Sequence, residues 1–209
     1  TLSPDNNQVA FVKDNNLYVT DLATNNVTQL TFDGETNRII NGSADWVYEE
    51  EFSMAQAFKW SPDGKKIAFI RFDESEVPEF NMQTWGPLYP QDYKFKYPKA
   101  GEKNALVSIH VVDLASKRIQ QMDAGPETDQ YLPRLYWTQD PNQLAFIRLN
   151  RLQNQLDLLQ ANASTGESKL ILSETSATYV DLDYNDDLQY LSDGKTFIRT
   201  SEQDGYKHI

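Results

Sequence analysis

Residues 58–72 read FKWSPDGKKIAFIRF, an aromatic segment, a tight turn and an apolar segment in close succession. Ser-Pro-Asp-Gly is a turn signal, because Pro restricts φ, the Asp side chain accepts backbone hydrogen bonds and Gly adopts positive φ. The segment after the turn is rich in β-branched and aromatic residues, which favours a strand. The unit returns at residues 135–150 as LYWTQDPNQLAFIRLN, so Trp60 and Trp137 are expected at equivalent core positions. The sequence therefore predicts a repeated strand–turn–strand unit.

A second pair of strands follows each copy of this unit. Residues 3–31, SPDNNQVAFVKDNNLYVTDLATNNVTQLT, predict three short strands separated by Asn- and Asp-rich turns. The second part recurs as VSIHVVDLASKRIQQM at 107–122 and as QLDLLQANASTGESKLIL at 155–172, and a further copy begins at residue 188 and stops at Ile209. Four-stranded antiparallel units in series are typical of the blades of a β-propeller. A β-sandwich with coincidental turns is the alternative architecture.

The repeats predict an all-β chain that forms a partial β-propeller of about three four-stranded antiparallel blades, with a short acidic helix inserted between blades. Blade segments are expected at about 1–32, 55–123, 132–173 and 178–209, with insertions at 33–54 and 73–106. An arc of this kind cannot protect its outermost strands by closing into a ring. We therefore expect the chain to be a fragment of a longer propeller domain.

Composition excludes several classes of function. Of 209 residues, 39% are hydrophobic and 24% are charged, which is typical of a globular domain. The 19 basic against 31 acidic residues give a net charge of −12, which opposes binding to a nucleic-acid backbone. The chain has no Cys, and its two His residues, His110 and His208, are too far apart for a local zinc motif. No apolar run is long enough for a membrane helix. We expect no metal and no cofactor.

The segment DWVYEEEF at residues 45–52 places three carboxylates inside an aromatic run. Asp45 is a candidate N-cap for a helix from Trp46 to Phe52. Successive residues of a helix lie ~100° apart, so two adjacent acids can converge on one point while the third faces elsewhere. This geometry favours Glu50 and Glu51 as a clamp for a compact cation, shielded from water by the neighbouring rings. A solvated acidic helix end, or pairing with Arg38 or Lys59, is the alternative interpretation.

Five motifs in order resemble the dipeptidyl peptidase IV family, serine exopeptidases of the prolyl-oligopeptidase clan, and the compact turns resemble a bacterial member. The motifs are DWVYEEEF at 45–52, FDESEVP at 72–78, YPKAGEKN at 97–104, LNRLQN at 149–154 and SEQDGYKHI at 201–209. The resemblance implies an N-terminal propeller of eight blades joined to a C-terminal α/β-hydrolase domain that carries the catalytic Ser, Asp and His. No G-x-S-x-G motif occurs in this chain, so we expect the fragment itself to lack catalytic residues.

The resemblance also implies roles for individual residues. Glu50 and Glu51 are expected to bind the free α-amine of a peptide that is cleaved after an X-Pro or X-Ala dipeptide, and Tyr48 and Tyr184 are further candidates for substrate contact. Residues 78–100 are the candidate surface of a homodimer. The resemblance implies a periplasmic, secreted or cell-envelope protein.

Two other functions remain open from the sequence. The first is the propeller of a tripeptidyl or acylaminoacyl peptidase of the same clan. The second is a propeller without enzymatic activity that binds protein partners.

Overall fold

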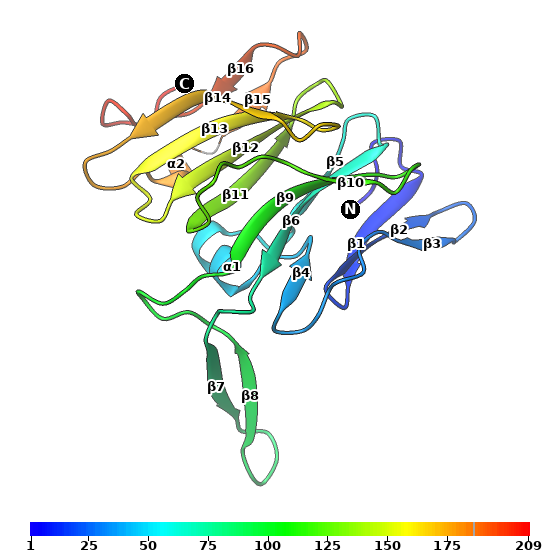
Figure 1. Cartoon of the computed structure of the whole chain (residues 1–209), viewed down its shortest axis with the longest axis vertical. Coiled ribbons are helices and arrows are strands. Elements are labelled where there is room, and N and C mark those ends of the chain that lie inside the picture. Colours follow the sequence, from blue (N-terminus) through cyan, green and yellow to red (C-terminus); the bar gives the residue numbers. More distant parts are fainter. Residues whose placement is uncertain (186) are drawn as a thin grey trace.

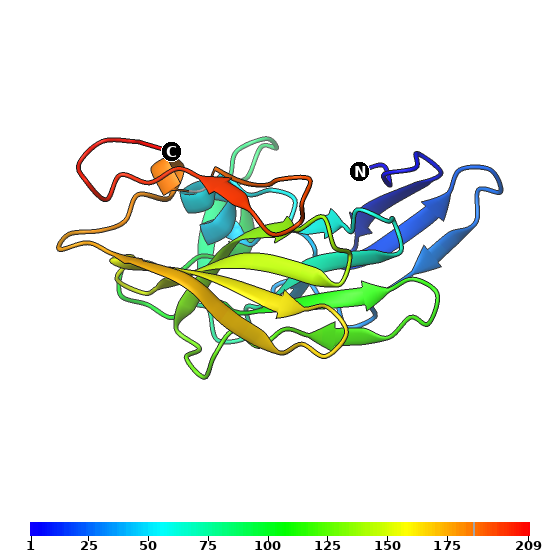
Figure 2. The same cartoon turned by 90° about the horizontal axis from the view of Figure 1, so that it is seen from above.

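The computed structural model describes residues 1–185 and 187–209. The chain forms antiparallel sheets that follow one another along an open arc, with the N-terminal and C-terminal strands at opposite ends (Figure 1). Seen from above, the first sheet lies at one side of the molecule, and the third sheet with the last hairpin beside it lies toward the other (Figure 2). The prediction of an all-β, partial propeller is confirmed.

The first sheet has three strands and the second has five. The first sheet has the order β1-β2-β3, and its strands are β1 (Gln8–Lys13), β2 (Asn16–Asp21) and β3 (Val27–Gln29). The second sheet has the order β10-β9-β6-β4, with β5 also paired to β6. Its strands are β4 (Ile39–Asn41), β5 (Phe58–Trp60), β6 (Lys66–Asp73), β9 (Leu106–Asp113) and β10 (Ile119–Gln121).

The third sheet is a regular four-stranded meander, and a short hairpin follows it. The meander has the order β11-β12-β13-β14 and consists of β11 (Gln130–Trp137), β12 (Gln143–Asn150), β13 (Gln155–Asn162) and β14 (Ser168–Thr175). The helix α2 (Leu182–Asn185) leads to the last hairpin, which consists of β15 (Leu188–Tyr190) and β16 (Phe197–Arg199).

The innermost strand of the second sheet is interrupted. Asn41 of β4 pairs with Arg71, and Phe58 of β5 pairs with Phe69 on the same strand β6, so residues 42–57 leave the sheet between them. These residues carry helix α1 (Trp46–Phe52). In the third sheet, the corresponding strand β11 is continuous but has a register shift between Tyr131 and Arg134. Helix α1 is thus inserted where the next blade has only a β-bulge.

The repeated turn and the repeated Trp form the same contacts in successive blades. Ser3 and Ser61 are buried, and their hydroxyl groups donate to Asp5 at 2.6 Å and to Asp63 at 2.7 Å. The indole N–H of Trp60 donates to the carbonyl oxygen of Thr1 at 3.2 Å, and the indole N–H of Trp137 donates to the carbonyl oxygen of Lys59 at 3.0 Å. Each indole therefore ties its sheet to the preceding one. Trp60 lies in the core, as predicted, whereas Trp137 is only half-buried.

Two apolar cores lie between the sheets. The smaller joins the first sheet to the second and contains Leu17, Trp60 and Phe69. The larger joins the second sheet, the third sheet and α1, and contains Tyr48, Phe72 and many aliphatic side chains of β11, β12 and β13. Because the apolar face of each sheet is covered by the next sheet, the arrangement of blades depends on contacts between residues distant in sequence.

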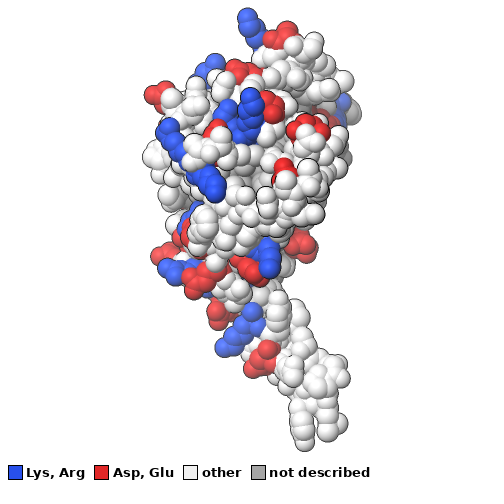
Figure 3. Space-filling model, turned by 90° about the vertical axis from the view of Figure 1, so that its right-hand side faces the viewer, with Lys and Arg blue, Asp and Glu red and all other residues white. Residues whose placement is uncertain are grey.

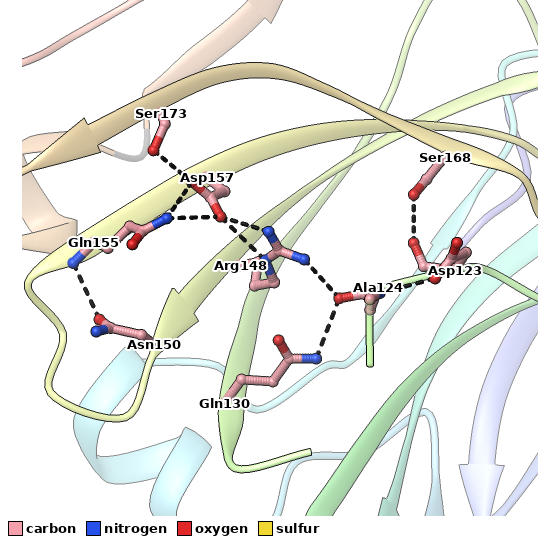
Figure 4. Close-up of polar contacts among 10 residues, drawn as sticks. Asp123, Ala124, Gln130, Arg148, Asn150, Gln155, Asp157, Ser168 and Ser173 are labelled. Carbon is pink, nitrogen blue, oxygen red and sulfur yellow. Dashed lines mark hydrogen bonds and ion pairs between the residues drawn. The ribbon is translucent and has the colours of Figure 1, made fainter. Parts of the chain in front are cut away.

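A partly buried ion pair adds a polar connection on the third sheet (Figure 4). Arg148 Nη2 lies 2.6 Å from Asp157 Oδ2, and Arg148 Nη1 donates to the Ala124 carbonyl oxygen at 2.8 Å. Burial alone would raise the pKa of Asp157, but hydrogen bonds from Ser173, Arg148 and Gln155 and the Arg148 charge hold that pKa below its ordinary value. Arg148 occupies the repeat position of Arg71, whose partner Asp33 is exposed.

The hairpin of β7 (Glu79–Thr84) and β8 (Gln91–Lys96) projects from the body of the molecule (Figure 1). Residues 82–91 at its tip include no charged residue, and the projection is largely free of charge toward its end (Figure 3). Trp85, Leu88 and Tyr89 are 76%, 90% and 77% exposed. In the part of the chain that the structure describes, no helix is long and apolar enough to cross a membrane.

Candidate functional site

Helix α1 begins and ends as the sequence predicts. The Asp45 carboxylate accepts a hydrogen bond from the Tyr48 N–H at 2.9 Å and forms the N-cap. The helix spans Trp46–Phe52, and Ser53 ends it in a left-handed conformation with φ 50°. The Ser53 N–H then bonds back to the Tyr48 carbonyl oxygen, which satisfies one of the free carbonyl groups at the helix end.

One face of α1 is fixed in the larger core. Val47, Tyr48 and Phe52 are buried, and the Tyr48 ring packs edge-on against Phe52 and Phe72 at 5.1 and 4.8 Å. The Tyr48 hydroxyl oxygen accepts the Leu132 N–H at 2.8 Å, at the bulge of β11. Tyr48 is therefore a core residue that anchors the helix, and in this structure its ring has no open face toward a peptide.

The three acidic side chains lie on the exposed side of α1. Glu49, Glu50 and Glu51 are exposed, and within residues 1–185 and 187–209 none of their side chains takes part in a hydrogen bond or an ion pair. Arg38 instead bonds Glu35 at 2.8 Å, so the pairing of the acids with Arg38 considered above is not formed. The Lys59 ammonium lies over the Tyr136 ring at 5.2 Å. Glu50 and Glu51 are thus accessible to a ligand.

The aromatic residues next to the acids are Trp46, Tyr48 and Phe52, and the expectation that they shield the acids from water is wrong for two of them. Tyr48 and Phe52 face the core because the apolar face of a seven-residue helix must be buried for the helix to be stable. Trp46 is half-buried and packs edge-on against Tyr97, with ring centroids 4.3 Å apart. Tyr184 lies in α2, and its side chain is outside the described residues, so its role in substrate contact stays a prediction.

Two buried carboxyl groups lie at the base of the helix, the predicted N-cap Asp45 and Glu74, which the sequence did not single out. Asp45 is 5% exposed, and burial raises its pKa to about 6 despite the hydrogen bond from Tyr48. Glu74 is 6% exposed, and burial together with the Asp45 charge raises its pKa to about 7, although Lys96 opposes the shift. Glu74 follows β6 in the acidic segment DESE, where no sequence pattern distinguishes a buried acid from exposed ones.

Arg134 on β11 is a second residue that the sequence did not single out. Its Nη1 donates to the carbonyl oxygen of Phe52, the last residue of α1, at 2.8 Å. The contact joins residues 82 positions apart, so no local motif predicts it. Among the described residues, no group of three or more His, Asp or Glu side chains is arranged to hold a metal ion.

Fold and site together define an open segment of a β-propeller that carries an acidic helix on an inserted loop. The family profile described as "Dipeptidyl peptidase IV (DPP IV) N-terminal region" matches residues 1–209. The chain belongs to the dipeptidyl peptidase IV family, as part of its N-terminal region.

Individual relatives agree with this assignment. The crystal structure of Porphyromonas gingivalis dipeptidyl peptidase 4 superimposes with a TM-score of 0.93 and 41% identity, over 100% of this chain and 30% of that one. Dipeptidyl peptidase 4 from Felis catus is 32% identical over 100% of this chain and 30% of its own length. Dipeptidyl peptidase 4 from Trichophyton equinum is 32% identical over 99% of this chain and 28% of its own. The chain thus spans less than a third of the relatives it matches.

Proposed function

We propose that this chain is the substrate-gating propeller segment of a serine-type dipeptidyl peptidase, in which Glu50 and Glu51 bind the free α-amine of the peptide. The observation that carries the proposal is the state of these two side chains. Both are exposed and unpaired within the described residues, on a helix whose opposite face is fixed in the core. A rigid support with free carboxylates suits the capture of a small cation.

The physical chemistry of the amine supports this role. A peptide α-amine has a pKa of ~7.7–8.0, so it is partly neutral near pH 7, and two adjacent carboxylates favour its charged form. One charge pair at ~4 Å is worth ~4 kcal/mol at an effective dielectric constant of ~20, but exposed pairs give only ~0–1 kcal/mol. Since Tyr48 and Phe52 face the core, we infer that the catalytic α/β-hydrolase domain of the whole protein covers the acids and excludes water.

A fixed amine site also determines which bond is cleaved. When the amine is held, the distance to the nucleophile sets how many residues are released, and the release of two residues is the activity of a dipeptidyl peptidase. Selectivity for Pro or Ala at the second position would come from a pocket of the hydrolase domain. Because relatives are named dipeptidyl peptidase 4, the release of dipeptides is favoured over the release of longer products. The preference for X-Pro and X-Ala is the part of the proposal that rests on the family resemblance.

The first prediction concerns the two glutamates in the whole protein. Glu50→Gln and Glu51→Gln keep the size of the side chain and remove its charge. Each is expected to lower kcat/KM for a free-amine X-Pro chromogenic amide on the order of 10²-fold, since loss of one partner of a buried charge pair costs ~2–5 kcal/mol. Steady-state kinetics measures the effect.

Glu49→Gln is the matched control, because Glu49 is exposed on the same helix and is not assigned to the clamp. It should change kcat/KM less than about threefold. The same amide with an acetylated amine should be a poor substrate of the unmodified protein. Full activity of both Gln variants, or efficient cleavage of the acetylated amide, contradicts the proposal, and release of tripeptides favours a tripeptidyl peptidase.

Two further proposals concern the oligomeric state and the cellular location of the whole protein. We infer that it forms a homodimer through the projecting hairpin, whose tip exposes Trp85, Leu88 and Tyr89. The family resemblance favours a periplasmic, secreted or cell-envelope location, which fractionation of cells with an antibody against the protein would test.

A further inference from the structure

Helix α1 ends in an electrostatically unfavourable way. Glu50 and Glu51 lie in its last turn, which contains no basic residue. The C-terminal end of a helix carries a partial negative charge, because its last carbonyl groups lack partners within the helix. Carboxylates at this end therefore destabilise the last turn of α1, which is the turn that carries Glu50 and Glu51. A stable position for the two acids requires a positive group from outside the helix.

Arg134, on strand β11 of the third sheet, places a positive group next to the end of α1. Its Nη1 donates to the Phe52 carbonyl oxygen at 2.8 Å and to the Pro133 carbonyl oxygen at 2.9 Å. Phe52 directly follows Glu51 and is the last residue of α1. A hydrogen bond from a guanidinium group is stronger than one between neutral groups, so it can hold the end of a short helix. The bond fixes the backbone beside Glu51.

The bulge of β11 lies beside α1 and makes a second contact with the helix in addition to that of Arg134. The register of β11 against β12 shifts between Tyr131 and Arg134. Within the bulge, the Leu132 N–H donates to the Tyr48 hydroxyl oxygen at 2.8 Å. Positions 132 and 134 of one strand thus hold Tyr48, near the start of α1, and Phe52, at its end. Two attachments at different points of a rigid helix fix its rotation about its own axis.

We propose that the β11 bulge is the seat that orients the amine-binding carboxylates, and that Arg134 is a positioning residue for Glu50 and Glu51. This inference rests on the amine-binding function proposed above. Arg134 acts through the helix and not through contact with the peptide. Loosening the helix end lets the two carboxylates separate, which weakens binding of the amine and leaves the chemical step intact.

The direction in which KM changes when Arg134 is removed distinguishes a positioning role of this residue from a purely electrostatic one. A guanidinium group repels the ammonium group of a peptide, so an Arg134 that acted only as a charge would weaken substrate binding. Its removal would then lower KM. A positioning role predicts the opposite, an increase of KM, because the loss of orientation outweighs the relief of repulsion.

The experiment uses the whole protein and a free-amine X-Pro p-nitroanilide. Arg134→Met removes the charge and the hydrogen bond and keeps an unbranched stem, while Arg134→Lys retains a cationic donor. For Arg134→Met we expect KM to rise about tenfold with kcat within about twofold, and for Arg134→Lys we expect most of this loss to be recovered. Arg118→Met is the matched control, since Arg118 is exposed, bonds Gln120 at 2.7 Å and should leave both constants unchanged.

A variant at Tyr48 tests whether the β11 bulge orients α1, without changing the charge of Arg134. Tyr48→Phe retains the ring and removes the acceptor of the Leu132 N–H, so KM is expected to rise about threefold with kcat retained. Near-ultraviolet circular dichroism checks that each variant is folded. If Arg134→Met does not fold, Arg134→Lys and Tyr48→Phe carry the test.

Three results overturn the inference. They are a fall in KM for Arg134→Met, unchanged KM in both Arg134→Met and Tyr48→Phe, and equal losses in Arg134→Lys and Arg134→Met. Glu50→Gln and Glu51→Gln are measured in the same assay. Loss of activity in these two variants with unchanged KM in the Arg134 and Tyr48 variants refutes the seat alone, whereas undiminished activity in the glutamate variants refutes the amine site and the seat together.

Discussion

Burial changes the behaviour of single acidic residues in this chain more than their sequence context does. Glu49, Glu50 and Glu51 are adjacent to one another and exposed, whereas Asp45 and Glu74 are buried at the base of the same helix. Burial disfavours a charged carboxylate, so the pKa values of Asp45 and Glu74 rise to about 6 and about 7. The exposed acids and the two buried acids whose pKa is raised thus lie on different faces of the same region of the chain.

Glu74→Gln tests the titration of the buried acid. The pKa of Glu74 is raised on folding, so the folded state binds more protons and the free energy of unfolding falls as pH rises from about 4.5 to about 7. Glu74→Gln removes this contribution. Relative to the unmodified protein, the variant should gain about 1–2 kcal/mol between pH 5 and pH 8, a figure that allows for solvent screening. Urea unfolding of the whole protein at both pH values measures it.

Glu79→Gln, at an exposed position of β7, provides the control and should show no such gain. A Glu74→Gln variant whose stability follows that of the unmodified protein at both pH values would contradict the titration of a buried Glu74.

The turns between strands connect neighbouring blades as well as reversing the chain. Gly166, in the turn between β13 and β14, has φ +82° and accepts a hydrogen bond from the Asp123 N–H at 2.8 Å. A Cβ atom at Gly166 would lie 2.2 Å from the Gln121 carbonyl oxygen of β10. The turn therefore packs against the backbone of the preceding sheet so closely that only glycine fits.

Gly166→Ala is expected to lower the free energy of unfolding by about 2–4 kcal/mol, because backbone strain and a clash between sheets add. Gly101→Ala is a matched control, since Gly101 has φ +85° and no atom within 4 Å of its ideal Cβ position. The control reports backbone strain alone, about 1 kcal/mol. Denaturant unfolding compares the two, and equal losses would show that the contact between the sheets contributes nothing.

At the scale of the whole molecule, the open arc and the projecting hairpin leave apolar surface uncovered. The hairpin strands β7 and β8 pair only with each other in the sheet topology. An isolated two-stranded hairpin is marginally stable in water. Its uncharged tip, with Trp85, Leu88 and Tyr89 exposed, is typical of a surface that another chain covers. A second copy of the whole protein is the partner that we propose.

Replacing residues 82–91 by an Asn-Gly turn should convert the proposed dimer of the whole protein to a monomer, because the apolar tip would supply the contact. Light scattering after size-exclusion chromatography measures the mass. The melting temperature of the monomer should show that the blades remain folded. Leu152→Ser, at a residue 74% exposed elsewhere on the molecule, is the control and should leave the mass unchanged. A shortened protein that remains dimeric would place the interface on another surface.

The features that depend on neighbouring residues could be predicted from the sequence alone. Strand alternation, Ser-Pro-Asp-Gly turns and an Asp N-cap are set by backbone geometry and by hydrogen bonds across a few positions, so the blades and the limits of α1 were predictable. The sequence also indicated Glu50 and Glu51 as acids on a helix. Their role in amine binding stays a prediction.

The direction in which α1 faces and the contacts that hold it depend on packing between distant segments of the chain. Tyr48 was expected beside the acids and instead lies in the core, bonded to Leu132, 84 positions away. Arg134 reaches Phe52 across 82 positions, and Glu74 is buried by packing that its own segment does not encode. Burial and orientation are properties of surfaces brought together from distant parts of the chain. Local pattern fixes the elements, and the packing of one blade on the next fixes their faces.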